Sequence, residues 1–204
     1  MNIISNNCIG GFLYKLNHLE YKNPFIWHQI SSSDFAKLMN TYDSIYFEDF
    51  ELEVNRRRLN KEYIISDTDV NCCHIRLSCG ITIYYNHYKC DNNAHKPTKI
   101  GFDIFYDRNF ELTYTKYVSR LERMTEKPVF VYFYKEPRND KDPKTDVLKM
   151  IGSSERNNQK LVLIVDFDID VKSKNVFLIK ESHLTPPHIV AEKYNQSIMQ
   201  FLAN

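Results

Sequence analysis

The sequence feature that most constrains the fold is a set of short, continuous apolar runs. The strongest is LVLIV at residues 161–165, and residues 129–133 and 176–179 have the same character. A strand buried on both faces reads as such a run, which is typical of parallel sheets covered by helices. Because helix-like segments alternate with these runs, the sequence predicts an α/β fold: a single three-layer domain with a largely parallel central sheet.

The remaining elements are predicted from periodicity and from turn residues. Further strands are expected at residues 2–5, 25–30, 44–47, 50–54, 74–77 and 81–85, and helices at residues 11–19, 34–39, 110–127, 146–151 and 189–202. Residues 90–110 are polar and irregular, and we expect them to form an insertion. The length of 204 residues fits one domain, residues 1–204, that carries this insertion.

Composition excludes several classes of protein. Lys and Arg number 27 and Asp and Glu 26, a net charge of +1, which argues against a dedicated binder of nucleic acid or acidic membranes. No apolar run approaches membrane-spanning length and no leader precedes a cleavage site, so we expect a cytoplasmic protein without membrane insertion. The five Cys residues fit free thiols in a reducing compartment better than a disulfide framework.

The first strand leads into a turn, SNNCIGG at residues 5–11, that we expect to be the functional edge of the sheet. Asn6 and Asn7 are good caps for the following helix, which places Cys8 at or beside its N-terminus. Unpaired N–H groups and the helix dipole favour a nucleophilic thiolate of low pKa there. Gly10 and Gly11 suggest room for a ligand close to the backbone. The alternative is a small buried Cys in a tight turn whose glycines allow close packing.

Three blocks of sequence resemble a bacterial family described as a domain of unknown function, number nineteen-nineteen. They are SNNCIGGFLYK with the following YKNPF, ITIYYNHYK ending at Lys89, and YTKYVSRLER starting at Tyr114. PFIW at residues 24–27 is also similar to a family of papain-like cysteine peptidases, which share an N-terminal Cys and a downstream His. Between Lys89 and Tyr114 the chain carries extra residues that the first family generally lacks. The resemblance implies a role in exopolysaccharide or capsule biosynthesis, but no reaction, because the family has none firmly assigned.

Cys8 and His87 form a candidate catalytic pair. If the two side chains meet, they provide a nucleophile and a base for acyl transfer to water or to a sugar hydroxyl. The N–H groups near Ile9 and Gly10 are candidates for an oxyanion hole. Candidates to orient the imidazole are Asn6, Asn7 and Asp166, and we include Asn7 among the predicted catalytic residues. The alternative for His87 is a structural, hydrogen-bonded His at the end of a strand.

A basic stripe follows the predicted helix at residues 110–127. Its members, at helical spacing, are Lys116, Arg120, Arg123 and Lys127. Such a stripe can clamp a phosphate or pyrophosphate, as in a coenzyme A thioester donor or a nucleotide sugar. The alternative is a solvated helix face paired with Glu122 and Glu126. The predicted ligand-binding residues are Asn6, Gly10, Gly11, Lys89, Tyr117, Arg120 and Arg123.

Three weaker signals complete the set of candidates. Asp166 and Asp168 resemble the acidic pair that holds a metal ion and a sugar diphosphate in glycosyltransferases, although a strand with a polar face explains them better. The Cys72, Cys73, His74 and Cys79 group has no standard zinc spacing, so no metal site is predicted. His183 and His188 precede the last helix and are alternative bases.

The leading hypothesis is a Cys/His-dependent acyltransferase or hydrolase that acts in cell-surface polysaccharide synthesis on a saccharide or sugar-nucleotide substrate. In it, Arg120 and Arg123 hold an anionic part of the donor or acceptor. The first alternative is a metal-dependent glycosyltransferase that uses sugar nucleotides. The second alternative is a non-catalytic assembly module of the polysaccharide machinery.

Overall fold

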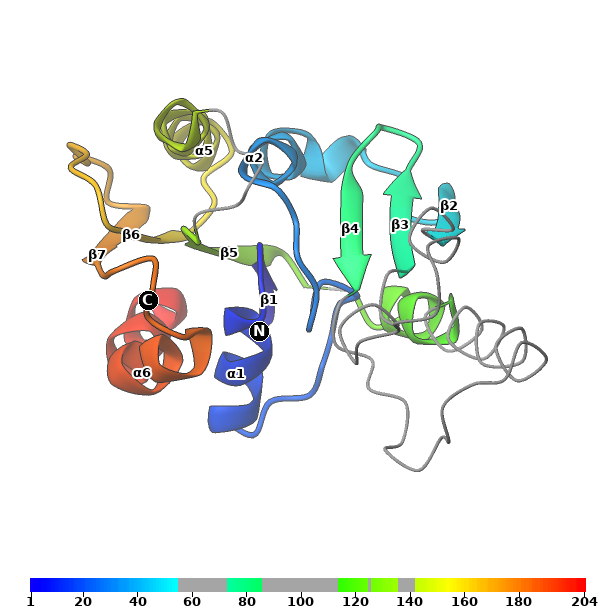
Figure 1. Cartoon of the computed structure of the whole chain (residues 1–204), viewed down its shortest axis with the longest axis horizontal. Coiled ribbons are helices and arrows are strands. Elements are labelled where there is room, and N and C mark those ends of the chain that lie inside the picture. Colours follow the sequence, from blue (N-terminus) through cyan, green and yellow to red (C-terminus); the bar gives the residue numbers. More distant parts are fainter. Residues whose placement is uncertain (55–72, 86–113, 125, 136–141) are drawn as a thin grey trace, which may run out of the picture.

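The computed structural model describes residues 1–54, 73–85, 114–124, 126–135 and 142–204 (Figure 1). Its centre is a four-stranded sheet of order β1-β5-β6-β7, in which every neighbouring pair of strands is parallel. The strands are β1 (Asn2–Ser5), β5 (Pro128–Phe133), β6 (Leu161–Val165) and β7 (Val176–Lys180). The apolar runs of the sequence are β5, β6 and β7, and the predicted α/β fold is confirmed.

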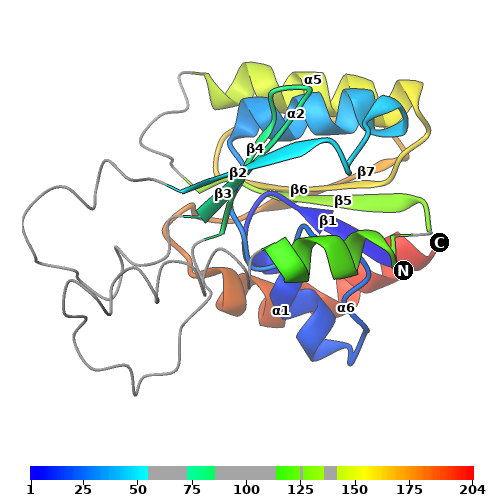
Figure 2. The ribbon, with the colours of Figure 1, turned by 90° about the vertical axis from the view of Figure 1, so that its right-hand side faces the viewer.

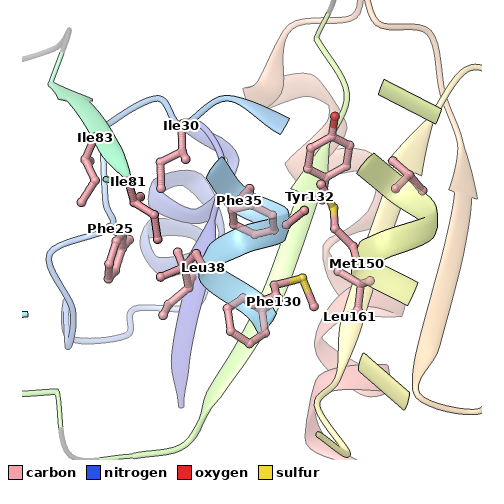
Figure 3. Close-up of a cluster of buried hydrophobic side chains, with 14 of the residues drawn as sticks. Phe25, Ile30, Phe35, Leu38, Ile81, Ile83, Phe130, Tyr132, Met150 and Leu161 are labelled. Carbon is pink, nitrogen blue, oxygen red and sulfur yellow. The ribbon is translucent and has the colours of Figure 1, made fainter. Parts of the chain in front are cut away.

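Helices cover both faces of this sheet. The helices α1 (Ile9–Leu16) and α6 (Pro187–Ala203) lie on one face, and α2 (Ser32–Thr41) and α5 (Pro143–Arg156) lie on the other (Figure 1, Figure 2). Alternate residues of β5 supply the two cores, because successive side chains of a strand point to opposite faces. Phe130 and Tyr132 pack on the α2–α5 side (Figure 3), and Val131 and Phe133 pack on the α1–α6 side.

The starts of α2 and α5 follow from local capping. Ser31 accepts a hydrogen bond from the Asp34 N–H at 3.1 Å, so α2 begins where the serine run predicts. Asp142 accepts one from the Thr145 N–H at 3.0 Å, and Pro143 occupies the first turn of α5. Helix α5 is therefore longer than the predicted segment at residues 146–151.

A second, antiparallel sheet of order β2-β3-β4 lies beside the first (Figure 1). Its strands are β2 (Phe50–Val54), β3 (Cys73–Leu77) and β4 (Thr82–Tyr85), and the short 3-10 helix η1 (Tyr42–Ser44) precedes it. The Thr82 N–H donates to the carboxylate of Asp34 at 3.2 Å, which fixes the start of β4 against the first turn of α2. Ile81 and Ile83 join the same core as Ile30 (Figure 3).

Three predicted elements differ from the structure. Residues 25–30 form a buried loop with one bridge residue instead of a strand, and residues 44–47 do not form a strand. The helix predicted at residues 110–127 is helical from 114 to 121 within the described residues. The insertion predicted at residues 90–110 lies outside the described residues. No helix in the described part of the chain is long and apolar enough to cross a membrane.

Candidate functional site

The carboxyl ends of the four parallel strands meet at one edge of the sheet, called here the carboxyl edge. Open α/β sheets bind ligands at this edge, next to adjacent strands whose connections leave toward opposite faces. Strand β1 leads to α1 on one face and its neighbour β5 leads to α5 on the other. Residues at the carboxyl edge are Asn6, Asn7 and Cys8 after β1, Tyr134 and Lys135 after β5, Asp166 after β6, and Glu181 and His183 after β7.

Asn6 and Asn7 join the ends of β1 and β5 through their side chains. The Asn6 amide donates to the Phe133 carbonyl oxygen at 3.1 Å and accepts from the Phe133 N–H at 2.9 Å. The Asn7 amide donates to the same carbonyl oxygen at 2.9 Å. These three bonds, called here the asparagine clamp, continue the sheet beyond the last paired residue of β1. The clamp engages both amides, which were predicted to orient an imidazole or to contact a ligand.

Cys8 is the N-cap residue of α1 and is half-buried at the carboxyl edge. The predicted position of the thiol at a strand-to-helix turn is therefore confirmed. Burial raises the pKa of the Cys8 thiol to about 11, against a smaller lowering effect of its own backbone N–H. The expected low pKa is wrong, because burial disfavours the thiolate by more than the backbone hydrogen bond favours it.

The N–H groups predicted to form an oxyanion hole are engaged inside the turn. The Ile9 N–H donates to the side-chain oxygen of Asn7 at 3.0 Å, and the Gly10 N–H donates to the Ser5 hydroxyl at 3.2 Å. A Cβ atom on Gly10 would collide with the Ser5 hydroxyl, and one on Gly11 would lie 2.7 Å from the Trp27 ring. Both glycines therefore allow close packing, as in the alternative interpretation, and they provide no space for a ligand.

Three of the predicted ligand-binding residues, Tyr117 and the stripe members Arg120 and Arg123, contact the protein itself. Tyr117 is buried and its hydroxyl donates to the Phe47 carbonyl oxygen at 3.0 Å. Arg120 is also buried, with its guanidinium carbon 5.5 Å from the centre of the Tyr21 ring. Arg123 lies 3.4 Å from the Glu20 carboxylate, while Glu126 pairs with Lys22 at 2.5 Å. Arg120 and Arg123 therefore attach this segment to the loop that follows α1, and Tyr117 attaches it to Phe47.

His87 and Lys89 lie outside the described residues, so the pairing of Cys8 with His87 stays a prediction. Strand β4 ends two residues before His87. The start of β4 is bonded to Asp34, and Ile30, just before α2, donates its N–H to the Asn6 carbonyl oxygen at 2.8 Å. The segment that leads to His87 is therefore attached to the same loop system that contacts the turn of Cys8.

Lys135 was not singled out from the sequence. It follows β5 at the carboxyl edge, and its ammonium nitrogen lies 5.4 Å from the centre of the Phe133 ring. Burial lowers the pKa of Lys135. The sequence signal that could have identified Lys135 is its position as the first cationic residue after a buried parallel strand.

Asp166 and His183 form a pair that the sequence had suggested only as separate candidates. The Asp166 carboxylate accepts hydrogen bonds from the backbone N–H of His183, at 3.3 Å, and from its ring Nδ1. Asp168 pairs with Lys180 instead. Residues 166–170 are not a strand, so the expected strand with a polar face is wrong.

His188, the other alternative base, packs on Phe12 with ring centres 5.7 Å apart. Of the Cys and His group at residues 72–79, only the Cys79 side chain is described, as a half-buried free thiol. Within the residues that the structure describes, no three His, Cys, Asp or Glu side chains are grouped as a metal site requires.

The comparison with protein families matches residues 1–100 to the family described as "Domain of unknown function (DUF1919)". The predicted resemblance is therefore confirmed for this part of the chain. The matched segment contains Cys8, His87 and Lys89, whereas Tyr117, Arg120 and Arg123 lie beyond it. None of the curated protein sequences compared with the chain matches it.

Proposed function

We propose that this chain, whose first hundred residues match a family without an assigned reaction, is an acyltransferase or hydrolase with Cys8 as nucleophile. The observation that carries the proposal is the position of Cys8: a half-buried thiol on a strand-to-helix turn, at the carboxyl edge of a parallel sheet. The substrate class is a saccharide of a bacterial exopolysaccharide or capsule, which the family resemblance implies. A coenzyme A thioester is the proposed acyl donor, and a cytoplasmic location fits such a donor.

The Cys8 thiol needs a base in this mechanism. Because its pKa is raised to about 11, the thiol is protonated at neutral pH and its proton must be removed as the sulfur attacks. His87 is the proposed base for this first half of the reaction. The sulfur forms a bond to the acyl carbon, and the donor's leaving group departs with the proton held by His87.

Lys135 is the proposed partner of the negative charge that develops on the acyl oxygen. Since the Ile9 and Gly10 N–H groups already donate within the turn, this charge requires another donor. Lys135 follows the strand that is clamped to the turn of Cys8, and it is a cation partly shielded from water. Its charge is therefore more effective than that of a fully hydrated surface lysine.

The test is acetylation of the purified protein by p-nitrophenyl acetate at pH 7.5, followed by peptide mass spectrometry. We expect acetyl-Cys8 to accumulate faster than acetyl-Cys79, the other half-buried thiol of the described chain. His87→Ala should slow acetylation of Cys8 by about 100-fold and leave that of Cys79 unchanged. Equal labelling of the two thiols, or no label on Cys8, contradicts the proposal.

A further inference from the structure

We infer that His183, Asp166 and the rings of Tyr134 and Phe167 form the subsite for the acyl acceptor, a saccharide hydroxyl. His183 takes the hydroxyl proton as this oxygen attacks the acyl group on Cys8. The inference rests on the proposed function, and it assigns the second half of that reaction to a base other than the one that serves Cys8.

Asp166 holds the imidazole of His183 in a fixed orientation. One carboxylate oxygen accepts from both the backbone N–H and the ring Nδ1 of His183. An ionised carboxylate only accepts hydrogen bonds, so the neutral imidazole carries its proton on Nδ1 and its lone pair on Nε2. This tautomer is the one in which Nε2 takes up a proton, as in base–carboxylate pairs of hydrolases.

The environment of the His183–Asp166 pair differs from that of the two ion pairs made by Asp168 and Asp170. The side chains of His183 and Asp166 are 27% and 26% exposed, whereas Asp168 and Asp170, which pair with Lys180 and Lys172, are 97% and 79% exposed. Partial enclosure strengthens an electrostatic interaction and still leaves access for a substrate. The His183–Asp166 pair therefore has the environment of a functional group, while the other two are ordinary surface pairs.

The loop that carries His183 is held at both ends. The Glu181 N–H donates to the Val165 carbonyl oxygen at 3.0 Å, next to Asp166. The Glu181 carboxylate accepts from the Thr185 hydroxyl at 3.0 Å and from Lys193 of α6 at 2.7 Å. A base on a loop fixed in this way is positioned before any substrate arrives.

The Tyr134 ring contacts both the base and the Phe167 ring, and it follows the strand that is bonded to the turn of Cys8. The Tyr134 ring lies 6.0 Å from the His183 ring and 5.4 Å from the Phe167 ring, between centres. Tyr134 directly follows Phe133, to which Asn7, the neighbour of Cys8, is bonded. Aromatic faces bind the apolar C–H face of a sugar ring, so this combination of rings and base suits a saccharide hydroxyl better than water alone.

The chemical step is balanced without any further reactant. The acceptor O–H bond breaks, its proton moves to Nε2 of His183, and the oxygen forms a bond to the acyl carbon of acyl-Cys8. The carbon–sulfur bond then breaks, and the proton moves from His183 to the departing sulfur, which restores the Cys8 thiol. His183 is thus a catalytic residue, and Asp166 is a positioning residue that acts through it.

The experiment separates the two halves of the reaction. Cys8 is acetylated with p-nitrophenyl acetate, excess reagent is removed, and loss of the acetyl group is followed by mass spectrometry with methyl glucoside as acceptor. We expect His183→Gln to slow transfer to the glucoside by about 100-fold and to slow acetylation much less. Asp166→Asn should slow the same step less, and Asp168→Asn, the matched control on the same connection, should not affect it.

Each other outcome has a definite meaning. Transfer from the His183→Gln variant at the wild-type rate overturns the inference, and so does an equal decrease of acetylation and transfer. Failure of the wild type to form acetyl-Cys8 overturns the proposed function and, with it, the step assigned to His183.

The positioning role of Asp166 is tested separately by ¹⁵N NMR of the His183 imidazole. The wild type should show protonation at Nδ1, and Asp166→Asn should lose that preference. An unchanged tautomer in Asp166→Asn overturns the role of Asp166.

Discussion

His28 is completely buried, and its imidazole interacts with the backbone of Ser5, which ends the strand before the turn of Cys8. Burial, together with the nearby positive charge of Arg120, lowers the pKa of His28 to about 3. The imidazole is therefore neutral in the folded protein over the whole physiological range. In the unfolded chain the same group titrates near its ordinary value of about 6.5.

The difference between the pKa of His28 in the folded protein and in the unfolded chain predicts that stability depends on pH. Between about pH 6.5 and pH 3 the unfolded state binds a proton at His28 that the folded state does not, so the free energy of unfolding decreases as the pH falls through this window. From pH 6 to pH 5 we expect a loss of about 1 kcal/mol from this group, and the loss should be absent in His28→Gln. Urea unfolding at the two pH values measures it, with the exposed His188→Gln as control. A His28→Gln variant that keeps the wild-type decrease would contradict the prediction.

The reactivity of individual residues was the property of the site that was hardest to predict from the sequence. The position of Cys8 at the start of α1 was predictable from the Asn caps and the glycines, because capping depends on neighbours in the chain. Its raised pKa was not, since the burial that causes it depends on tertiary packing around the turn. The pairing of Asp166 with His183 likewise depends on the parallel order of β6 and β7.

At the level of single elements, α1 is shaped by what its glycines contact. Gly11 packs against the face of the Trp27 ring, and Trp27 itself has a positive φ of 60°. Trp27 belongs to residues 25–30, where the apolar pattern predicted a strand. The buried side chain of Asn23 bonds to the Phe25 N–H at 2.8 Å and to the Ile3 carbonyl oxygen at 2.8 Å, and so fixes a loop there. An apolar run shows burial, but it cannot distinguish a buried strand from a buried loop.

This packing predicts opposite effects for one substitution at two helical glycines. Gly11→Ala places a methyl group 2.7 Å from the Trp27 ring and should destabilise the protein by about 1–3 kcal/mol. Gly152→Ala in α5 is the matched control, because its nearest neighbour is the flexible end of Arg156 at 3.3 Å. It should be neutral or stabilising by up to about 1 kcal/mol, as expected for Ala in place of Gly in a helix. Thermal unfolding of both variants tests this, and equal midpoints would show that the Trp27 contact has no effect.

At the level of the whole molecule, the parallel sheet could be predicted and the position of β1 in it could not. Continuous apolar runs indicated strands covered on both faces, which is the pattern that β5, β6 and β7 show. The order β1-β5-β6-β7 places the first strand beside one that begins more than a hundred residues later. The asparagine clamp marks this pairing, but an Asn pair in a sequence reads first as a helix cap.

Removal of the clamp should weaken the junction of β1 and β5. Asn6→Ala deletes both hydrogen bonds to Phe133 and leaves a buried N–H group without its acceptor, so we expect destabilisation by about 1–3 kcal/mol. Asn175→Ala, which removes a bond to Asn158 at the surface, is the matched control and should have a much smaller effect. Chemical denaturation compares the two, and an equal loss of stability would mean that the clamp contributes nothing specific.

The pairing of β1 with β5 also affects the order in which the protein is synthesised and folded. Phe133, the partner that fixes the turn of Cys8, is synthesised 127 residues after Asn6. Contacts between distant parts of a chain form slowly, because a long loop must close before they contribute. The turn of Cys8 is therefore synthesised well before the strand that positions it, and it reaches its final geometry only after β5 has paired with β1.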